Sequence, residues 1–489
     1  MRKFISALIV IAFSLTGCST SVAATSTNFY NQKLSWSSCG TNLKCATVTV
    51  PIDWAHPTAG TIKLSINKLA STGAADLGYI LENPGGPGAS GIDFVAGGGN
   101  QVGSPELRKH YNVIGFDPRG VQRSAPIKCY DAAGLDSVLY DSYGTPGSTE
   151  ELAKTRVEMK KLIAACKKNS GKIFGFVDTV SAAKDMDVIR AALGQKKLNY
   201  LGFSYGTFLG TTYAALFPTN VGRMVLDGAM DPSVSDEQQS LNQLKAFDQA
   251  LRNYLANCLS TTDCVFSGTV DSAMTRITNF FKGLEVKPIK TQDGRMLNAV
   301  SGITGLIMTL YSNDYWQYLS QAFTAAFKGD GTMFMRLADF YNDRSSNGTY
   351  STNTFEANLA VSCLDSRADS SAAALAAQNQ KVLAISPFLG RYWQNGAVGC
   401  ENWPYPVAKH PASYAAKGSA PIVVVGTTGD PATPYWQAQN LANKIFANGH
   451  LVTFNGEGHT AYGRSNSCVV GAVDGYLLQG IVPAKDPNC

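Results

Sequence analysis

A serine flanked by glycines stands between a predicted strand and a predicted helix. The segment is Gly202-Phe203-Ser204-Tyr205-Gly206, with an apolar run at 198–202 before it and a helical pattern over 207–217 after it. Small residues two before and two after the serine permit a strained turn that lifts its Oγ clear of the backbone. The pattern predicts Ser204 as a nucleophile. The alternative is a tight strand-to-helix turn that merely contains a serine.

A serine nucleophile needs a base, and the chain contains five histidines. His459 lies in a loop directly after a late predicted strand, in Gly456-Glu-Gly-His-Thr-Ala-Tyr462. The other four lie in polar turns before proline or at the start of a strand: His56, His110, His410 and His450. Because enzymes with such a serine turn place the histidine last along the chain, His459 is the predicted base.

The third member of the triad should be a carboxylate between the serine and the histidine. Asp430, in Gly429-Asp-Pro-Ala-Thr-Pro434, follows the apolar run 421–426 and is the predicted acid. It would hold one imidazole tautomer and stabilise the cation formed during attack. Two alternatives remain: Asp227 follows the strand before a long insertion, and Glu457 precedes the histidine by two residues.

Acyl transfer also needs N–H donors for the developing oxyanion. The glycine-rich segment Asn83-Pro-Gly-Gly-Pro-Gly88 follows an early strand, where backbone can approach a substrate carbonyl without an intervening side chain. We expect the amides of Gly86 and Tyr205 to form the oxyanion hole. An ordinary glycine turn is the alternative.

Strand and helix patterns alternate around these residues. The runs 46–50 and 62–69 have a period of two, as in antiparallel edge strands, whereas 79–81, 111–116, 198–202, 224–226, 421–426 and 450–454 predict buried strands. Helical patterns at 181–193 and 207–217 separate several of them. This rhythm predicts an α/β fold with a mostly parallel sheet flanked by helices.

The rhythm stops for about 180 residues, in which apolar residues recur only at helical spacing. The predicted organisation is therefore one sheet domain, residues 35–228 and 411–489, interrupted by a large helical insertion at 229–410.

The first residues predict export. Met1-Arg2-Lys3 and the apolar stretch 4–15 resemble a signal peptide, and Leu15-Thr-Gly-Cys18 matches a bacterial lipobox. We expect residues 1–17 to be removed, Cys18 to be lipidated, and residues 18–34 to form a tether at the outer face of the cytoplasmic membrane. The alternative is a secretory peptide cut after Ala24. No other apolar run in the sequence is long enough for a membrane anchor.

Charge and cysteine content exclude some functions. The formal charge is +5, two of these charges belong to the leader, and no basic cluster supports nucleic-acid binding. Cys18 aside, ten cysteines remain in an exported chain, which favours disulfides over metal ligands. Pairing of near neighbours predicts Cys39–Cys45, Cys129–Cys166, Cys258–Cys264, Cys363–Cys400 and Cys468–Cys489. No zinc-type spacing occurs, and neither a metal nor an organic cofactor is expected.

Seven short motifs in order resemble the tripeptidyl and prolyl aminopeptidase group of α/β-hydrolases, from about residue 35 to the C-terminus. They are Glu82-Asn-Pro-Gly-Gly-Pro-Gly88, Phe116-Asp-Pro-Arg-Gly120, Gly202-Phe-Ser-Tyr-Gly-Thr207, Arg223-Met-Val-Leu-Asp-Gly228, Ala360-Val-Ser-Cys-Leu-Asp365, Asp430-Pro-Ala-Thr-Pro434 and Gly458-His-Thr-Ala-Tyr462. The resemblance implies the same triad, and a helical cap over it, which the insertion would supply.

The resemblance also implies a serine exopeptidase that releases short peptides, expected to be tripeptides, from substrates with a free N-terminus. In such enzymes acidic side chains of the cap bind the substrate ammonium, and the candidates here are Glu356 and Asp365. Two rival functions remain open. One is a carboxylesterase or lipase with the same triad, and the other is an inactive hydrolase fold that serves as a surface binding protein.

Overall fold

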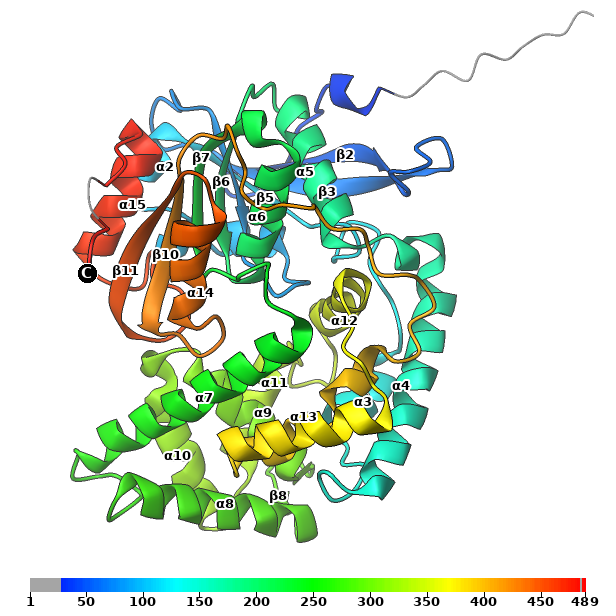
Figure 1. Cartoon of the computed structure of the whole chain (residues 1–489), viewed down its shortest axis with the longest axis vertical. Helices are drawn as coiled ribbons and strands as arrows, with labels where there is room; N and C mark the ends of the chain where they lie inside the picture. Colours follow the sequence, from blue (N-terminus) through cyan, green and yellow to red (C-terminus); the bar gives the residue numbers. More distant parts are fainter. Residues whose placement is uncertain (1–27, 484–485) are drawn as a thin grey trace, which may run out of the picture.

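A nine-stranded sheet forms the centre of the upper half of the molecule in Figure 1. The computed structural model describes residues 28–483 and 486–489. The strand order is β1-β2-β3-β5-β4-β6-β7-β10-β11, and every pair from β5 to β11 is parallel. The strands are β1 (Ser37–Gly40), β2 (Leu43–Pro51), β3 (Thr61–Leu69), β4 (Tyr79–Asn83), β5 (Asn112–Phe116), β6 (Leu198–Phe203), β7 (Val221–Asp227), β10 (Ile422–Gly429) and β11 (Gly449–Glu457).

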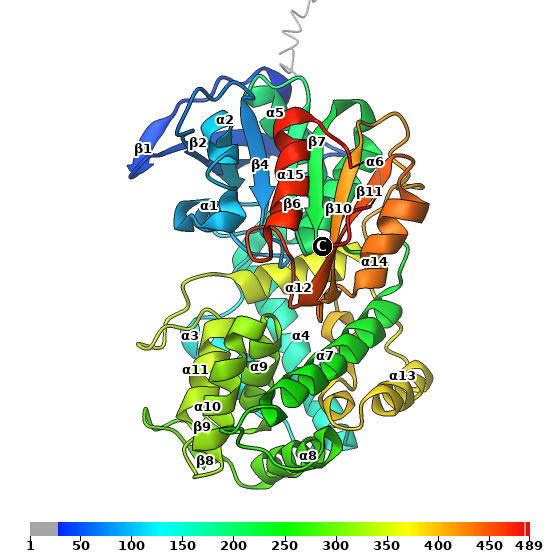
Figure 2. The same ribbon diagram turned by 90° about the vertical axis from the view of Figure 1, so that its left-hand side faces the viewer.

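The two long strands with a period of two pair at one edge of this sheet. β2 and β3 are antiparallel over their full length, and β3 is antiparallel to β5. The prediction of antiparallel edge strands beside a parallel sheet is therefore confirmed. The carboxyl ends of the parallel strands face the lower half of the molecule (Figures 1 and 2), so the loops that follow β4, β6, β7, β10 and β11 gather there.

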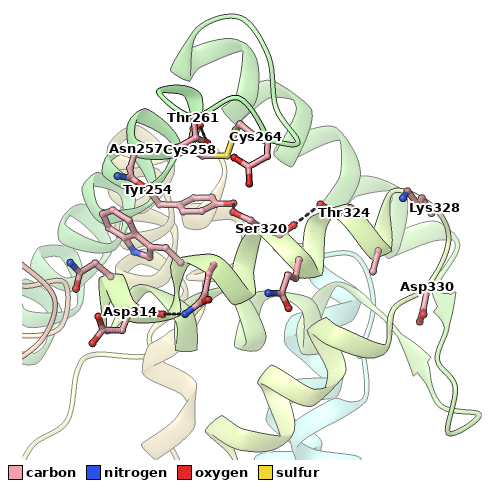
Figure 3. Close-up of a pocket in the computed structure, with 16 residues that line it drawn as sticks. Tyr254, Asn257, Cys258, Thr261, Cys264, Asp314, Ser320, Thr324, Lys328 and Asp330 are labelled. Atoms are coloured by element: carbon pink, nitrogen blue, oxygen red, sulfur yellow. Dashed lines mark hydrogen bonds between the residues drawn. A yellow bond between two sulfur atoms is a disulfide. The ribbon is translucent and has the colours of Figure 1, made fainter.

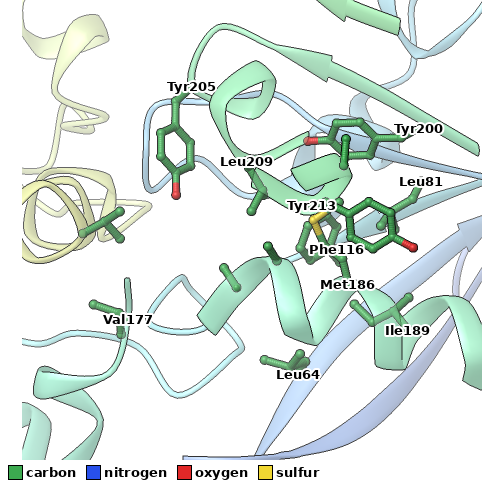
Figure 4. Close-up of a cluster of buried hydrophobic side chains, with 14 of the residues drawn as sticks. Leu64, Leu81, Phe116, Val177, Met186, Ile189, Tyr200, Tyr205, Leu209 and Tyr213 are labelled. Atoms are coloured by element: carbon green, nitrogen blue, oxygen red, sulfur yellow. The ribbon is translucent and has the colours of Figure 1, made fainter. Parts of the chain in front are cut away.

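Alternate residues of the central strands pack on opposite faces. In β7, Met224 and Leu226 join a core cluster with α5 (Thr179–Ala192), α6 (Tyr205–Leu216) and α14 (Tyr435–Asn440), part of which Figure 4 shows. Val225 joins a second cluster with α1 (Gly91–Gly97), α2 (Leu107–His110) and α15 (Ser467–Gln479). Helices thus cover both faces of the sheet, which explains the nearly continuous apolar runs of these strands. The predicted α/β-hydrolase fold is confirmed.

The chain between β7 and β10 forms a separate helical layer below the sheet (Figure 2). Its helices are α7 (Asp236–Leu259), α8 (Val270–Val286), α9 (Ala299–Leu310), α10 (Trp316–Ala326), α11 (Thr332–Tyr341), α12 (Thr354–Asp365) and α13 (Ala372–Ile385). Six of them, α7 to α11 and α13, share a hydrophobic cluster rich in phenylalanine, whereas buried residues of α12 belong to the first cluster of the sheet. The sequence missed one small hairpin in this cap, β8 (Ile289–Lys290) with β9 (Met296–Leu297).

The cap also contains a segment that the sequence placed in the sheet domain. α3 (Ala132–Tyr140) and α4 (Thr149–Ser170) lie beside the cap helices rather than over the sheet (Figures 1 and 2). Arg344 of the cap binds Asp136 at 2.7 Å, and Tyr140 donates to Asp339 at 2.8 Å. The structure thus groups residues 132–170 with the cap. The sequence does not indicate this, because few residues of α4 are buried and its apolar pattern is weak.

Disulfides join the same five pairs of cysteines that near-neighbour pairing predicts. Cys129–Cys166 closes the α3–α4 segment, and Cys363–Cys400 ties α12 to the end of the cap. α12 lies between the sheet domain and the remaining cap helices (Figure 1). It is therefore the cap helix placed nearest to the loops that carry the candidate site.

Candidate active site

Ser204 occupies a sharp turn between β6 and α6. Its backbone has φ 55° and ψ −125°, a conformation that costs energy for any residue with a Cβ. Its amide donates to the carbonyl of Asp227 at 2.9 Å, which fixes the turn against β7. Gly206 must be small, because a Cβ there would lie 2.6 Å from the Asn83 carbonyl oxygen. The segment has the strained strand-to-helix geometry of a nucleophile elbow.

Asp430 and His459 form a buried pair at the ends of β10 and β11. The Nδ1 of His459 lies 2.9 Å from each carboxylate oxygen of Asp430. The carboxylate also accepts bonds from the amides of Ala432 (2.9 Å) and Thr433 (2.8 Å) and from the Thr433 hydroxyl (3.0 Å). These contacts fix the orientation of the carboxylate, which is placed to accept a hydrogen bond from an Nδ1–H of His459.

His459 lines a cavity, and its other ring nitrogen is not paired within the described part of the chain. Nε2 is buried and has no hydrogen-bond partner among the described residues. His459 and Ser204 both line a cavity of about 410 Å³, together with Pro84, Gly86, Tyr311, Tyr341, Asn342, Thr354, Phe355 and Asn358. The cap supplies six of these residues, from α11, α12 and the end of α9. A basic nitrogen and a serine thus share one enclosed space, the arrangement that nucleophilic catalysis requires.

Neither rival acid contacts the histidine ring through a hydrogen bond. The Asp227 carboxylate accepts from the amides of Ala461 and Tyr462. Its burial raises the pKa of Asp227 to about 6. Glu457 accepts from Asn253 of α7 at 2.9 Å and so contacts the cap. The geometry therefore favours Asp430 among the three candidates.

The predicted oxyanion donors lie on adjacent backbone segments. Gly85, with φ +99°, packs so tightly against the elbow that a Cβ would lie 2.9 Å from the Ser204 Cβ and 3.1 Å from the Tyr205 nitrogen. The Asn83 side chain accepts the Gly85 amide at 3.0 Å. The amides of Gly86 and Tyr205, in contrast, donate to no protein acceptor within the described part of the chain. Two unpaired N–H groups beside Ser204 are what an oxyanion hole needs.

Sequence comparison places this geometry in a known group. Residues 386–489 match a family model described as TAP-like protein. Serine protease Hip1 of Mycobacterium tuberculosis (strain H37Rv) is 34% identical, over 99% of this chain and 96% of that protein. Carboxylesterase B of the same strain is 37% identical, over 93% and 89% of the two chains. Tripeptidyl aminopeptidase of Streptomyces lividans is 30% identical, over 93% and 86%.

The chain belongs to the TAP-like family of α/β-hydrolases. It is a serine hydrolase, and the family resemblance read from the seven motifs is confirmed. The names of these relatives include peptidases and an esterase. Family membership therefore leaves the choice of substrate to the residues of the site.

Glu356 lies away from the cavity that contains Ser204. In this TAP-like chain its carboxylate accepts from the backbone amides of Cys129 (2.5 Å) and Tyr130 (3.3 Å), and burial raises its pKa. It lies at the start of α12 but does not line the Ser204 cavity. The structure thus places Glu356 in a contact between α12 and the segment before α3, not beside the nucleophile.

Asp365 lines a second pocket behind the oxyanion loop. This pocket has a volume of about 340 Å³ and is also lined by Pro87, Tyr205 and Asp236. Pro87 and Tyr205 directly follow Gly86 and Ser204 in the sequence. Thr179 donates to Asp365 through its amide (2.8 Å) and its hydroxyl (2.5 Å). Burial raises the pKa of Asp365 to about 8. Asp236, which the sequence did not single out, brings a second carboxylate to this pocket at the start of α7.

The Ser204 cavity is not the largest hollow among those lined by the described residues. A groove of about 950 Å³ lies on the cap between the end of α7 and α10, and its lining residues differ entirely from those of the Ser204 cavity (Figure 3). Amide and hydroxyl side chains dominate it. Within residues 28–483 and 486–489, no cluster of His, Cys, Asp or Glu is placed to bind a metal ion.

The predicted anchor lies outside the described residues. Residues 1–17 and Cys18 fall in the undescribed N-terminal segment, as does most of the predicted tether 18–34. In the part of the chain that is described, none of the helices combines the length and apolarity of a membrane span.

Proposed function

We propose that this TAP-like hydrolase is a serine exopeptidase that releases short peptides, expected to be tripeptides, from the free N-termini of peptides and proteins. The observation that carries the proposal is the Asp430–His459 pair: His459 lines the same capped cavity as Ser204, and its Nε2 has no partner among the described residues. The names of two relatives, a serine protease and a tripeptidyl aminopeptidase, support the peptide substrate class.

The reaction follows from the positions of the groups. His459 Nε2 takes the proton of Ser204 as its Oγ attacks the scissile carbonyl, and the Gly86 and Tyr205 amides donate to the oxyanion. The imidazolium, stabilised by Asp430, then protonates the departing amine, which leaves an acyl ester on Ser204. Water repeats the sequence, with His459 again as base, and the free acid departs. The chain's own residues suffice for each proton transfer.

We place the binding site for the substrate ammonium in the second pocket. Asp236 and Asp365 line it, whereas the lining of the Ser204 cavity includes no carboxylate. A substrate whose carbonyl lies between the Gly86 and Tyr205 amides could extend past Pro87 and Tyr205 to reach these acids. An ammonium there would favour the ionised form of Asp365, which burial otherwise opposes. This revises the pair expected from the sequence, with Asp236 in place of Glu356.

Three measurements test the proposal. A fluorophosphonate probe should label the wild-type enzyme and not Ser204→Ala, and absence of labelling in the wild type would favour a binding protein. A panel of chromogenic tripeptides with free and acetylated N-termini should then show turnover only for the free amines. Asp236→Asn should raise KM for free-amine peptides and leave hydrolysis of a simple ester unchanged. Equal turnover of blocked and free peptides would refute the exopeptidase assignment.

A carboxylesterase is the second candidate. The cavity with Ser204 is lined by aromatic and neutral polar side chains, which suits an uncharged acyl group, and Carboxylesterase B is among the relatives. An esterase should hydrolyse short-chain acyl esters with a kcat/KM well above that for any peptide in the panel. The opposite ranking is expected for the proposed exopeptidase.

We also propose that the enzyme is exported and anchored through a lipid on Cys18. The lipobox at residues 15–18 supports this proposal. Expression of wild type and Cys18→Ser in a bacterial host, followed by membrane fractionation, tests it. The wild type should sediment with membranes and Cys18→Ser should not; equal distribution of both would contradict the anchor.

A further inference from the structure

The short turn after β7 contacts all three loops of the candidate triad. The carbonyl of Asp227 accepts the Ser204 amide at 2.9 Å. Its carboxylate accepts from Ala461 (3.0 and 3.1 Å to its two oxygens) and Tyr462 (2.7 Å) in the loop that carries His459. One residue is therefore bonded on one side to the nucleophile and on the other to the segment of the base.

The next residue extends these contacts to the acid loop. Gly228 has φ +67°, and a Cβ at this position would lie 3.1 Å from His459 Cε1 and 3.2 Å from the Thr433 hydroxyl. Thr433 in turn donates to Asp430. The turn Asp227–Gly228 is thus packed directly against the imidazole and against the residue that orients the acid.

We infer that Asp227 is a positioning residue of the hydrolase, whose ionised carboxylate fixes the histidine loop in register with Ser204. The inference rests on the proposed triad, and it assigns Asp227 a role other than that of the triad acid. The carboxylate is fully buried, and no described side chain pairs with it as an ion pair, so its hydrogen bonds are to backbone amides. Such bonds to an ionised acceptor are stronger than neutral ones and specify direction.

The energetic reason is that catalysis depends on sub-ångström placement. If the amides of Ala461 and Tyr462 lost their acceptor, the loop could shift, and the distance between His459 Nε2 and Ser204 Oγ would change. A misplacement of about 1 Å lowers a rate by about a hundredfold. The ground-state binding of substrate would change little, because Asp227 does not line the Ser204 cavity.

A pH dependence follows from the groups around Asp227. The charged groups that face it are His459 and Asp430, from the loops after β11 and β10. Its burial raises the pKa of Asp227 to about 6, so its ionisation falls within the acid limb of a serine hydrolase profile. An amide at this position cannot titrate and removes a negative charge from beside the imidazolium. The acid limb of kcat/KM should therefore move to lower pH.

The test compares Asp227→Asn with a matched control, Asp187→Asn. Asp187 is also buried and accepts from Arg190, Tyr213 and Asn220 at 2.6–2.9 Å, but it lies in α5, away from the three loops. We expect Asp227→Asn to lower kcat on a simple ester about tenfold to a hundredfold with KM within threefold. The acid limb of its kcat/KM profile should move to lower pH, whereas Asp187→Asn should change neither kcat nor the position of that limb.

Asp227→Ala should lose more activity than Asp227→Asn, because alanine removes every acceptor while the amide keeps the shape and one oxygen. If the alanine variant does not fold, the comparison of kcat between Asp227→Asn and Asp187→Asn still tests the inference. A kcat for Asp227→Asn equal to that of the control, or an unmoved acid limb, would overturn the inference. Absence of fluorophosphonate labelling in the wild type would instead refute the proposed function, so the two failures are distinguishable.

Discussion

Replacing Asp430 with asparagine isolates its effect on the histidine, because the structure dictates how the amide must orient. One carboxylate oxygen, Oδ1, accepts the amides of Ala432 (2.9 Å) and Thr433 (2.8 Å). The oxygen of an asparagine will take this place, since an NH₂ group there would face two N–H donors. The NH₂ group then replaces Oδ2. Because Nδ1 of His459 lies 2.9 Å from both oxygens, it meets one donor in place of one of its two acceptors.

An NH₂ donor at that point favours the opposite tautomer of the imidazole, in competition with the oxygen that remains. In that tautomer Nδ1 accepts from the NH₂ group, Nε2 carries the proton, and Nε2 cannot take the proton of Ser204. A substitution of this kind costs about 10⁴-fold in kcat in a triad with the same geometry. That corresponds to about 5.5 kcal/mol of transition-state stabilisation.

The assay is kcat at neutral pH on a chromogenic ester and on a free-amine tripeptide, with thermal unfolding as the control for folding. Both substrates should lose activity to the same extent, and the unfolding midpoint should change little because the amide preserves the shape of the carboxylate. A loss below tenfold for Asp430→Asn, together with a larger loss for Asp227→Asn, would refute the assignment and favour Asp227 as the acid.

Three further outcomes are expected. Gly85→Ala should abolish labelling by a fluorophosphonate, because the new Cβ would lie 2.9 Å from the Ser204 Cβ; normal labelling would contradict the tight packing. Arg119→Met should lower the free energy of unfolding by about 3–5 kcal/mol in denaturant titrations, since it leaves Asp185 as a buried carboxylate without its bidentate partner; a loss under ~1 kcal/mol would contradict this. Burial raises the pKa of Asp365 to about 8. Between about pH 4 and 8 the folded state therefore keeps this proton while the unfolded state releases it, and the free energy of unfolding falls as the pH rises. Between pH 5 and 8 the free energy of unfolding should therefore fall less for Asp365→Asn than for the wild type, by up to ~1.4 kcal/mol per pH unit. Equal dependence of the unfolding free energy on pH in the two proteins would contradict a raised pKa of Asp365.

Local sequence patterns were sufficient to predict those features that a single short segment of chain determines. The elbow needs only the residues around Ser204, and a period of two identifies β2 and β3 whatever they pair with. Near-neighbour pairing of cysteines succeeded because each pair is separated by at most 37 residues. These features depend on short stretches of chain, and short stretches are what a sequence displays directly.

The structure adds contacts between residues that lie far apart in the chain, which the sequence does not display. Glu356 was expected to bind substrate because it is acidic and lies in the cap, yet it accepts backbone amides more than 220 residues earlier. α4 was left in the sheet domain because its apolar pattern is weak and because its ion pair, Arg156 with Glu401, joins residues far apart in the sequence. Asp236 escaped notice since only the fold brings it beside Asp365. Which carboxylate meets a ligand depends on tertiary contacts.

The close packing of separate motifs explains why several of them carry glycine. A Cβ on Gly85 would meet Ser204, a Cβ on Gly206 would meet the Asn83 carbonyl, and a Cβ on Gly228 would meet His459. Each glycine thus lies where one catalytic segment crosses another, so four motifs far apart in the chain form a single packing unit. An alanine at any of these positions changes the distance between two loops of the site rather than one loop alone. The rate of acyl transfer should respond to it even when the altered residue touches no substrate.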